Sequence, residues 1–368
     1  MLADKPSPLI MNQSPAGGPE AIGDADQFTK SASAPRPESR VASTREERLL
    51  LSAASGGNDE AVKALLADGV SARVAEESPP HATALCNAAF EGHAECVALL
   101  LPHSDPNQMC AQGTALHFAA SGGNAECLKL LLPHCDPAAL DSFDCTALIV
   151  AAGGGNLESA QLLLPVSDAN AVSGFTRGNR NALMAAAAHG GVSAGGLIAL
   201  LAPGTENLDA KDSDGRTALM HAIRNGGDLR PGQAPAYAPL LGRADANIVD
   251  GTDGFTALEM AIQGDWIEDV KRLAPFTDLH TPRQGWCPID WAVRHAAWEI
   301  ADFLAPLSRP EDAAKAFEKI GQEGMPHWAA RLENEALRAA VEETAANNLS
   351  NSSQPQKKAP LKRKSRAL

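Results

Sequence analysis

The chain has 368 residues, of which 44% are hydrophobic and 4% aromatic, and its formal net charge at pH 7 is −14. This length exceeds one ordinary globular core, and the scarcity of aromatic residues favours an interior of Ala and Leu. An acidic protein repels nucleic-acid phosphates, and no stretch reaches the roughly 18 apolar residues of a membrane span, so we expect neither nucleic-acid binding nor membrane insertion.

Residues 1–42 are rich in Pro, Ser, Ala and Gly and show no helical or strand period. Such a composition predicts a disordered segment, because it cannot bury enough apolar surface to offset the entropy lost on ordering. The segment has no cationic start followed by an apolar block, so it is not a general secretory signal peptide. Ser/Pro-rich starts also resemble the export signals of bacterial type III effectors, and both interpretations stay open.

Order is expected to begin at Thr44, which with Glu47 has the spacing of a helix capping box. One pattern then recurs across residues 43–306: a Thr-Ala-Leu opening, two small residues, a Gly-rich break, a Glu-led apolar stretch and a Leu run closed by Pro. Its clearest copy covers residues 113–133. The opening position is occupied in successive units by Thr83, Thr114, Thr146, Asn181, Thr217, Thr256 and Cys287.

Each position of this pattern has a physical role. A Thr or Asn side chain accepts a hydrogen bond from the first turn of a helix, and Leu116, Ala119 and Ala120 then share one helical face. Gly ends the first helix, Glu suits the start of a second helix, and Pro stops it. One such helix pair cannot bury its apolar face alone, so successive pairs are expected to stack into a curved solenoid in which each unit touches its neighbours.

The pattern resembles the ankyrin repeat, which has a period of roughly 33 residues and opens with Thr-Pro-Leu-His. Ala replaces the family's Pro in most units, only His117 matches the family's His, and the links after Pro are a residue short, as in residues 102–107. The resemblance implies an all-α ankyrin-type helix-turn-helix solenoid of about eight repeats with disordered termini. It also implies that His117 is a structural imidazole bonded near Thr114.

Two units depart from the pattern. Residues 190–196 are expected to lengthen the turn between the two helices of one unit, and residues 226–239 form a Pro/Gly-rich insertion. Insertions of this kind lie on one face of a repeat array and are often functional.

The pattern ends at residue 306. Residues 310–320 and 326–343 then predict two helices, each with Pro near its first turn. We expect residues 307–345 to form a C-terminal cap, because a bare solenoid end exposes core surface.

The last residues, 346–368, turn polar and then basic, and we expect a disordered basic tail. Three interpretations of this tail stay open: a nuclear import signal, a transient anchor to anionic surfaces, or a solubilising end. Its cations are Lys357, Lys358, Lys362, Arg363, Lys364 and Arg366.

The seven cysteines form no C-x-x-C motif. Cys96 and Cys127 occupy the same position of the second helix, where buried thiols pack like small hydrophobic side chains. An odd number of cysteines without a signal peptide favours a reducing compartment. Cys135 and Cys145 lie near His134, but their spacing fits no metal motif, so we expect no metal site and no cofactor.

The sequence contains no familiar catalytic motif of a metalloprotease, serine hydrolase, P-loop protein or kinase. His93 and Cys96 are three residues apart, but a nucleophile also needs a pocket and a third, orienting group. We therefore expect no catalytic residue. A cysteine-dependent enzyme using residues 127–145 is kept as a weak alternative.

The remaining function is recognition of another protein. The resemblance implies that the partner binds to the tips of the turns between repeats and to the concave face of the first helices. Aromatic and Arg side chains, which dominate binding energies, are found at the predicted tips. Phe175, Arg177 and Arg180 lie in an extended link that the fold does not require, whereas Phe255 and Trp286 can instead pack on an adjacent tip. The candidate partner-binding residues are Phe143, Phe175, Arg177, Arg180, Arg216, Phe255 and Trp286, with Met109 at a further tip.

The sequence therefore predicts a non-enzymatic, monomeric, cytoplasmic scaffold or adaptor that binds another protein. The first alternative is an exported bacterial effector that acts on host proteins and could reach the host nucleus through the basic tail. The cysteine-dependent enzyme is the weaker alternative.

Overall fold

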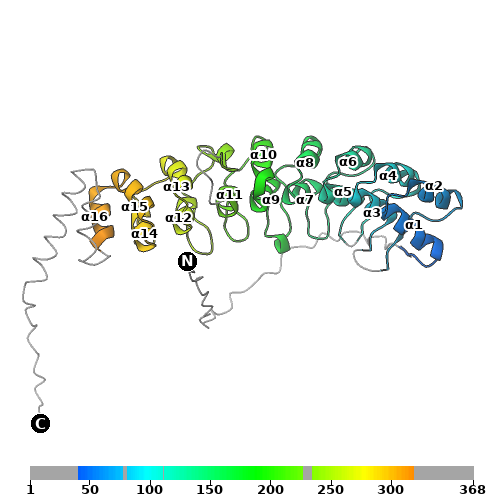
Figure 1. Ribbon diagram of the computed structural model, residues 1–368, viewed down its shortest axis with the longest axis horizontal. Helices are drawn as coiled ribbons and strands as arrows, with labels where there is room; N and C mark the ends of the chain where they lie inside the picture. Colours follow the sequence, from blue (N-terminus) through cyan, green and yellow to red (C-terminus); the bar gives the residue numbers. More distant parts are fainter. Residues whose placement is uncertain (1–39, 78–80, 111, 227–233, 319–368) are drawn as a thin grey trace, which may run out of the picture. The chain divides into compact units, whose positions relative to one another are not determined.

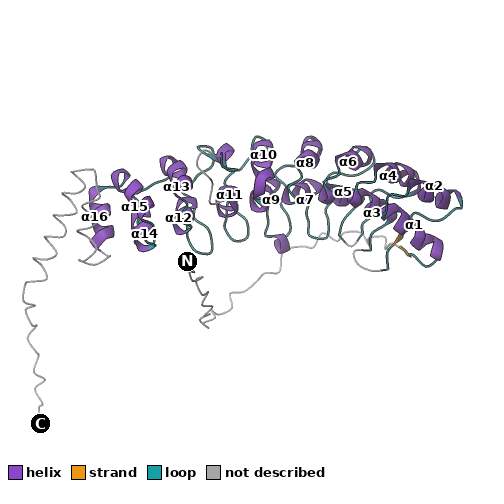
Figure 2. Cartoon of the chain, viewed as in Figure 1, coloured by secondary structure: helices purple, strands orange, loops and turns teal. Residues whose placement is uncertain are grey.

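The computed structural model describes residues 40–77, 81–110, 112–226 and 234–318. All of them belong to one of two compact units of the chain, and the other unit, Met1–Arg36, lies outside the described residues. Helices dominate the described residues (Figure 2). The strands among them are β1 (Arg40–Val41) and β2 (Val74–Ala75), which pair in parallel. The predicted all-α fold class is confirmed.

The helices of the described unit form two layers (Figure 1). Helices of the first layer contact one another in chain order, and α16 (Pro310–Glu318) packs on the last of them. These helices are α1 (Arg45–Ser55), α3 (Ala84–Glu91), α5 (Ala115–Gly122), α7 (Ala147–Gly153), α9 (Ala182–His189), α11 (Ala218–Gly226), α12 (Ala257–Gln263) and α14 (Pro288–Arg294). The second layer contains α2 (Asp59–Ala67), α4 (Ala94–Leu100), α6 (Ala125–Leu131), α8 (Leu157–Leu163), α10 (Gly191–Leu201), α13 (Ile267–Leu273) and α15 (Trp298–Leu304).

The predicted helix starts are set by local hydrogen bonds. Thr44 and Glu47 form a complete capping box at the start of α1. The Thr146 side chain accepts a hydrogen bond from the backbone N–H of Ile149, and Asn181 accepts one from Met184. These bonds satisfy amides that have no partner within the helix, which is why Thr and Asn recur at this position. The same bond is made by Thr83, Thr217 and Thr256.

Helices α4, α8, α13 and α15 of the second layer end at prolines, as the pattern predicts. Pro102, Pro165, Pro275 and Pro306 each lie in a short 3₁₀ turn that directly follows the helix. These turns are η1 (Leu101–His103), η2 (Leu164–Val166), η5 (Ala274–Phe276) and η6 (Ala305–Leu307).

Close approach of neighbouring helices explains the small residues. Ala119 and Ala120 are fully buried in α5, which packs between α3 and α7. Gly122 ends α5 at a point where a Cβ atom would clash with the backbone oxygen of Phe90 in the preceding unit. Larger side chains at these positions would force the first-layer helices apart, so the core depends on Leu residues of the second layer, such as Leu128 and Leu131, for its volume.

Two sets of hydrogen bonds connect neighbouring units. In the first, which we call the turn ladder, Asn124 Nδ2 donates to the Ala89 oxygen at 2.9 Å and Asn156 Nδ2 donates to the Ala120 oxygen at 2.8 Å. His93 and His189 make the same kind of bond to the carbonyls of Ser55 and Gly153.

The second set, the linker ladder, joins the links that follow the second helices. In each case a side-chain oxygen accepts a hydrogen bond from a backbone N–H of the next unit, at 2.7 to 2.9 Å. The acceptor and donor residues are Asn107 and Asp136, Asn170 and Glu206, Asp209 and Asp245, and Asn247 and Asp278.

The prediction that residues 190–196 lengthen a turn is wrong. Gly190 alone separates α9 from α10, with a φ of 67° that favours glycine. The additional residues are helical, so that α10 has 11 residues whereas α8 has 7. Ala194, Leu197 and Ile198 are buried on one face of α10, and this packing stabilises the longer helix despite its glycines.

The Pro/Gly-rich insertion lies partly outside the described residues, which resume at Ala234. The short 3₁₀ helix η4 (Ala238–Leu240) then contacts α10, so it stands in the second layer where the other units have a helix. Tyr237 is fully buried, and its hydroxyl donates to Asp269 of α13. A buried tyrosine thus fills space that a Leu run fills elsewhere.

The predicted C-terminal cap over residues 307–345 is described in part. Helix α16 corresponds to the predicted helix over residues 310–320, and its Ala313 and Ala314 are buried. The predicted helix over 326–343, the basic tail and the segment 1–39 lie outside the described residues. No helix among the described residues has both the length and the apolar character needed to cross a membrane.

Candidate functional site

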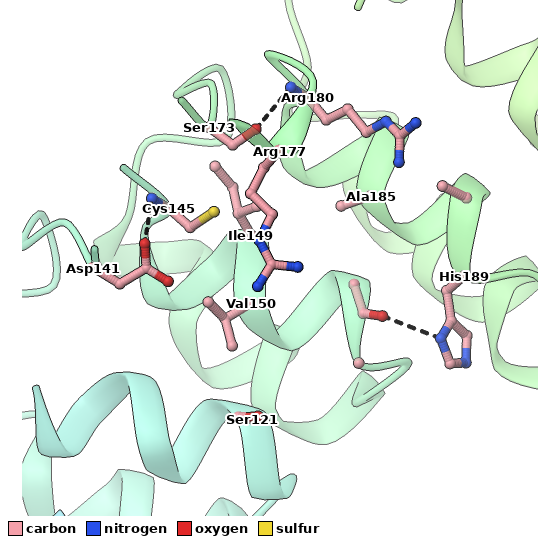
Figure 3. Close-up of a pocket in the computed structure, with 13 residues that line it drawn as sticks. Ser121, Asp141, Cys145, Ile149, Val150, Ser173, Arg177, Arg180, Ala185 and His189 are labelled. Carbon is pink, nitrogen blue, oxygen red and sulfur yellow. Dashed lines mark hydrogen bonds between the residues drawn. The ribbon is translucent and has the colours of Figure 1, made fainter. Parts of the chain in front are cut away.

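A groove of about 420 Å³ lies between the loops that precede α7 and α9 and the exposed faces of these helices (Figure 3). We call it the central groove. A smaller hollow of about 130 Å³ adjoins it and shares Ser121, Asp141, Val150 and Arg177 with it. Because residues of successive units contribute to it, the groove exists only when the units stack.

The floor of the central groove is made of small side chains. Ser121, Gly153, Gly154 and Ala185 lie on first-layer helices or directly after them, where larger residues would fill the space. Val150 adds an apolar surface, and the adjoining hollow includes the rings of Phe90 and Phe118, which pack edge to face at 6.4 Å. The floor therefore offers both apolar contact and room for another chain.

Arg177 points into the groove from the short 3₁₀ helix η3 (Phe175–Arg177) (Figure 3). Gly178 ends this helix with a φ of 85°. The guanidinium carbon of Arg177 lies 4.2 Å from the centroid of the Phe143 ring, which is a cation–π contact between tips of successive units. The ring holds the guanidinium in place without using its N–H donors.

Asp141, an acid that lines the groove, is engaged by backbone amides. Its Oδ1 atom accepts hydrogen bonds from the N–H groups of Phe143 at 2.7 Å and Cys145 at 2.9 Å. No carboxylate among the described residues lies within ion-pair distance of Arg177. The Arg177 guanidinium therefore presents donors to the groove.

Arg180, the second arginine of the groove, is fixed by an ion pair. Its Nε donates to Asp212 Oδ2 at 3.2 Å, and His221 Nε2 donates to the same oxygen at 2.7 Å. Burial of Asp212 raises its pKa, but hydrogen bonds from the Arg216 N–H and from His221 and Arg180 outweigh burial and lower the pKa overall. Burial lowers the pKa of His221. Arg180 thus ties one tip to the next unit.

Phe175 is 80% exposed and projects from the same 3₁₀ helix as Arg177. It does not line the central groove. The backbone N–H of the preceding residue, Gly174, donates to the Phe143 oxygen at 2.9 Å, so this tip is anchored to its neighbour while the phenyl ring remains accessible.

The Arg216 guanidinium is held by side chains of its own tip and of the next one. Its Nη1 atom donates to Asp214 at 3.0 Å, its Nη2 atom donates to Thr252 at 3.1 Å, and its Nε lies 3.6 Å from Asp250. These contacts link two successive tips, and the structure places Arg216 outside the central groove.

Phe255 and Trp286 pack on the same residue, Trp291 of α14. The ring centroids of Phe255 and Trp291 are 5.0 Å apart, and those of Trp286 and Trp291 are 6.1 Å apart. Arg294 lies over the Trp286 ring at 5.1 Å. The structure thus brings these two predicted residues together in an aromatic cluster, separate from the set around Arg177. Sequence reasoning did not single out Trp291.

His117 has the structural position that the resemblance implied. Its Nε2 donates to the Cys145 oxygen at 3.0 Å, and the Thr114 hydroxyl donates to its Nδ1 at 2.9 Å. Burial lowers its pKa, so the imidazole is neutral near pH 7. A neutral, fully bonded imidazole connects two units and has no free nitrogen for proton transfer.

All seven cysteines are free and buried. Burial raises the pKa of Cys135 and of Cys145 to about 12, and that of Cys127 to about 11. A nucleophilic cysteine needs a lowered pKa and exposure, so the thiols of the 127–145 region are poorly suited to catalysis. In the part of the chain that the structure describes, no group of three or more His, Cys, Asp or Glu side chains could hold a metal ion.

The sequence signals for the groove itself were weak. The sequence predicted Phe143 and Arg177 at tips, but it did not predict that they contact each other. Ser121, Ala185 and His189 were missed, because small residues on first-layer helices are also expected from close helix packing alone.

The first part of the array matches a known family. The family model of ankyrin repeats matches three overlapping copies, at residues 35–110, 85–173 and 116–194. No match was found among curated proteins. The matched copies contain α1 to α9 and the central groove, and the helix pairs continue beyond them. Residues 35–194 therefore consist of ankyrin repeats, which are generally protein-interaction modules.

Proposed function

We propose that the protein is an interaction scaffold whose central groove binds an acidic segment of a partner protein. The observation that carries the proposal is Arg177, whose guanidinium is held over Phe143 and faces a groove of about 420 Å³. A guanidinium binds a carboxylate through two parallel hydrogen bonds, which fix the orientation of the bound group.

The surroundings of Arg177 support a peptide-like occupant. The floor of Ser121, Gly153 and Ala185 leaves room for a backbone, and Val150 and Phe118 provide apolar contact. The whole chain has a net charge of −14, which disfavours an acidic partner in general, so Arg177 determines where such a segment binds. The exposed ring of Phe175 beside the groove adds an aromatic contact of the kind that dominates interface energies.

The test uses the full chain and an array of synthetic peptides that carry Asp or Glu, each paired with its Asn or Gln counterpart. Arg177→Gln should weaken binding of acidic peptides about tenfold or more, and Arg177→Lys should restore part of it. Arg73→Gln, at an exposed arginine outside the groove, is the control with the same change in charge. Equal binding of acidic and amide peptides by the wild type would contradict the proposal.

The tip residue is tested in the same assay. Phe175→Ala should leave stability within about 0.5 kcal/mol of the wild type, because the ring is exposed, and should weaken binding. The matched control is Phe276→Ala, at another exposed phenylalanine. If Phe175→Ala and Phe276→Ala bind alike, the tip does not take part.

Cytoplasmic location and a monomeric state belong to the same proposal and are checked by fractionation and by light scattering of the purified chain. The alternative of an exported effector depends on residues 1–42, most of which lie outside the described residues. Fusion of this segment to a reporter decides between them, because export of the reporter would favour the effector.

A further inference from the structure

Two of the free cysteines face each other across neighbouring units. The Sγ atoms of Cys86 and Cys110 are 3.2 Å apart, and both side chains are buried. Cys86 lies in the first turn of α3, and Cys110 lies in the loop that leads to α5. The groove and the proposed partner do not involve this pair.

The position of the pair follows from the repeat. Cys86 is the third residue after the helix cap Thr83, as His117 is after Thr114. His117 reaches into the base of the next loop, where it is hydrogen-bonded to the Cys145 oxygen and interacts with the charge of Asp141. Cys86 reaches the base of the next loop in the same way, but there it meets a second thiol.

Cys110 is bridged to Gly113 just before α5. The Cys110 N–H donates to the Gly113 oxygen at 2.9 Å, and the two residues form an isolated antiparallel bridge. Gln112 beside them is exposed. Irregular segments open more readily than helices, so a local opening at this turn can expose Cys110 to a small solute without unfolding of the array.

The two thiols differ chemically. The hydrogen bond from Cys86 lowers the pKa of Cys110, and the same bond raises the pKa of Cys86. A thiolate held against a thiol is the arrangement of an attacking cysteine with a resolving cysteine beside it. Cys135 and Cys145, in contrast, have pKa values raised to about 12 by burial.

We propose that Cys86 and Cys110 form an oxidation site that hydrogen peroxide converts to an intramolecular disulfide joining two neighbouring units. The Cys110 thiolate attacks one peroxide oxygen, the O–O bond breaks, and the products are a sulfenic acid and a hydroxide ion. The Cys86 sulfur then attacks the sulfenic sulfur, the S–O bond breaks, and the second oxygen leaves as water. In total, two thiols lose two electrons and two protons, and the peroxide becomes two water molecules.

The geometry allows the bond. A disulfide requires the sulfur atoms to approach to about 2.05 Å, a movement of about 1 Å that side-chain rotation and a small shift of the loop can supply. The bond would close a loop between residues 24 positions apart and fasten the tip that carries Met109 to α3.

The experiment treats the folded full chain with a modest excess of hydrogen peroxide, quenches it, and maps peptides by mass spectrometry without reduction. We expect a Cys86–Cys110 peptide that is lighter by two hydrogen atoms and is released by a thiol reductant. Of the seven thiols, five should still react with a thiol reagent after denaturation. Cys96→Ser is the control and should leave the crosslink unchanged.

Cys110→Ser should abolish the crosslink, and Cys86→Ser should leave Cys110 as a sulfenic acid that a dimedone probe labels. The peptide map of the wild type decides the proposal by itself, whether or not these two variants fold. Seven reactive thiols after treatment, or a crosslink between other cysteines, would overturn the proposal.

Discussion

The core is filled differently in two regions of the array: the helix pair α5–α6, and the part of the chain that contains α11 and η4. In the first, Leu128 and Leu131 of a second-layer helix fill the core. In the second, buried Tyr237 and Leu240 fill it from a 3₁₀ turn. The array therefore needs apolar volume in its second layer rather than a helix as such.

What remains constant between the two regions is the connection to neighbours. The linker ladder continues past η4, since Asp209 accepts a hydrogen bond from the Asp245 N–H at 2.8 Å. The first-layer helices also contact in order, from α9 through α11 to α12. Continuity of the array is therefore maintained by the first layer and the links.

The largest effect is expected in the regular region. Leu131→Ala should lower the free energy of unfolding by about 2 to 5 kcal/mol, because Leu131 is fully buried and its truncation leaves a cavity. Leu130→Ala, at the exposed neighbour, should cost less than about 1 kcal/mol. Urea unfolding followed by circular dichroism measures both, and similar values for the two variants would contradict the register of α6.

Close approach in the first layer is tested by glycine substitutions. Gly122→Ala should cost about 1 to 3 kcal/mol, because the added methyl clashes with the Phe90 backbone. Gly153→Ala is the control, since its nearest neighbour would be the Ala185 Cβ at 3.8 Å, and it should be neutral or stabilising by up to about 1 kcal/mol. Thermal unfolding compares them, and a stable Gly122→Ala protein would show that the helices can separate without cost.

The irregular region is tested at Tyr237. Tyr237→Phe keeps the ring but removes the donor to buried Asp269, and should cost about 1 to 2 kcal/mol near neutral pH. Burial raises the pKa of Asp269, and the bond from Tyr237 opposes this rise. A raised pKa in the folded state means stability that is present at low pH and lost as pH rises through that pKa. The difference between variant and wild type should therefore grow from about pH 4 to about pH 7, and a constant difference would show that Asp269 is not involved.

The smallest effect concerns His117 in the regular region. Burial lowers its pKa in the folded state, so the unfolded chain binds the proton first as the pH falls. Stability should decrease between about pH 7.5 and 5.5, by at most about 1.4 kcal/mol for each unit by which the pKa is lowered. His117→Gln should reduce this dependence in urea titrations, and an unchanged slope would assign it to other groups.

The helix starts could be predicted because capping is local: Thr146 and Asn181 bond to amides three residues away. The extension of α10 could not be predicted, because Gly190 and the residues after it suit a turn equally well. The helix is favoured only by the burial of Leu197 and Ile198 in the core. The replacement of a helix by η4 depends on the contact of Tyr237 with α13, which no local pattern indicates. The count of about eight repeats and the domain boundaries stay predictions.

The sequence indicated single residues of the candidate site but not that they lie together. Arg177 and Phe143 were both expected at tips, yet their cation–π contact requires two units in register. Arg216 looks the same as Arg177 in sequence, and only the structure shows that Asp214 and Asp250 engage its guanidinium.

The linker ladder bears on how the protein melts. Each of its bonds joins one unit to the next, so cooperativity passes along the array from neighbour to neighbour. The weakest coupling in the second layer is expected where η4 stands in for a helix. A calorimetric scan should then resolve two transitions, one for the block ending at α10 and one for the block beginning at α12, rather than a single endotherm for the whole array.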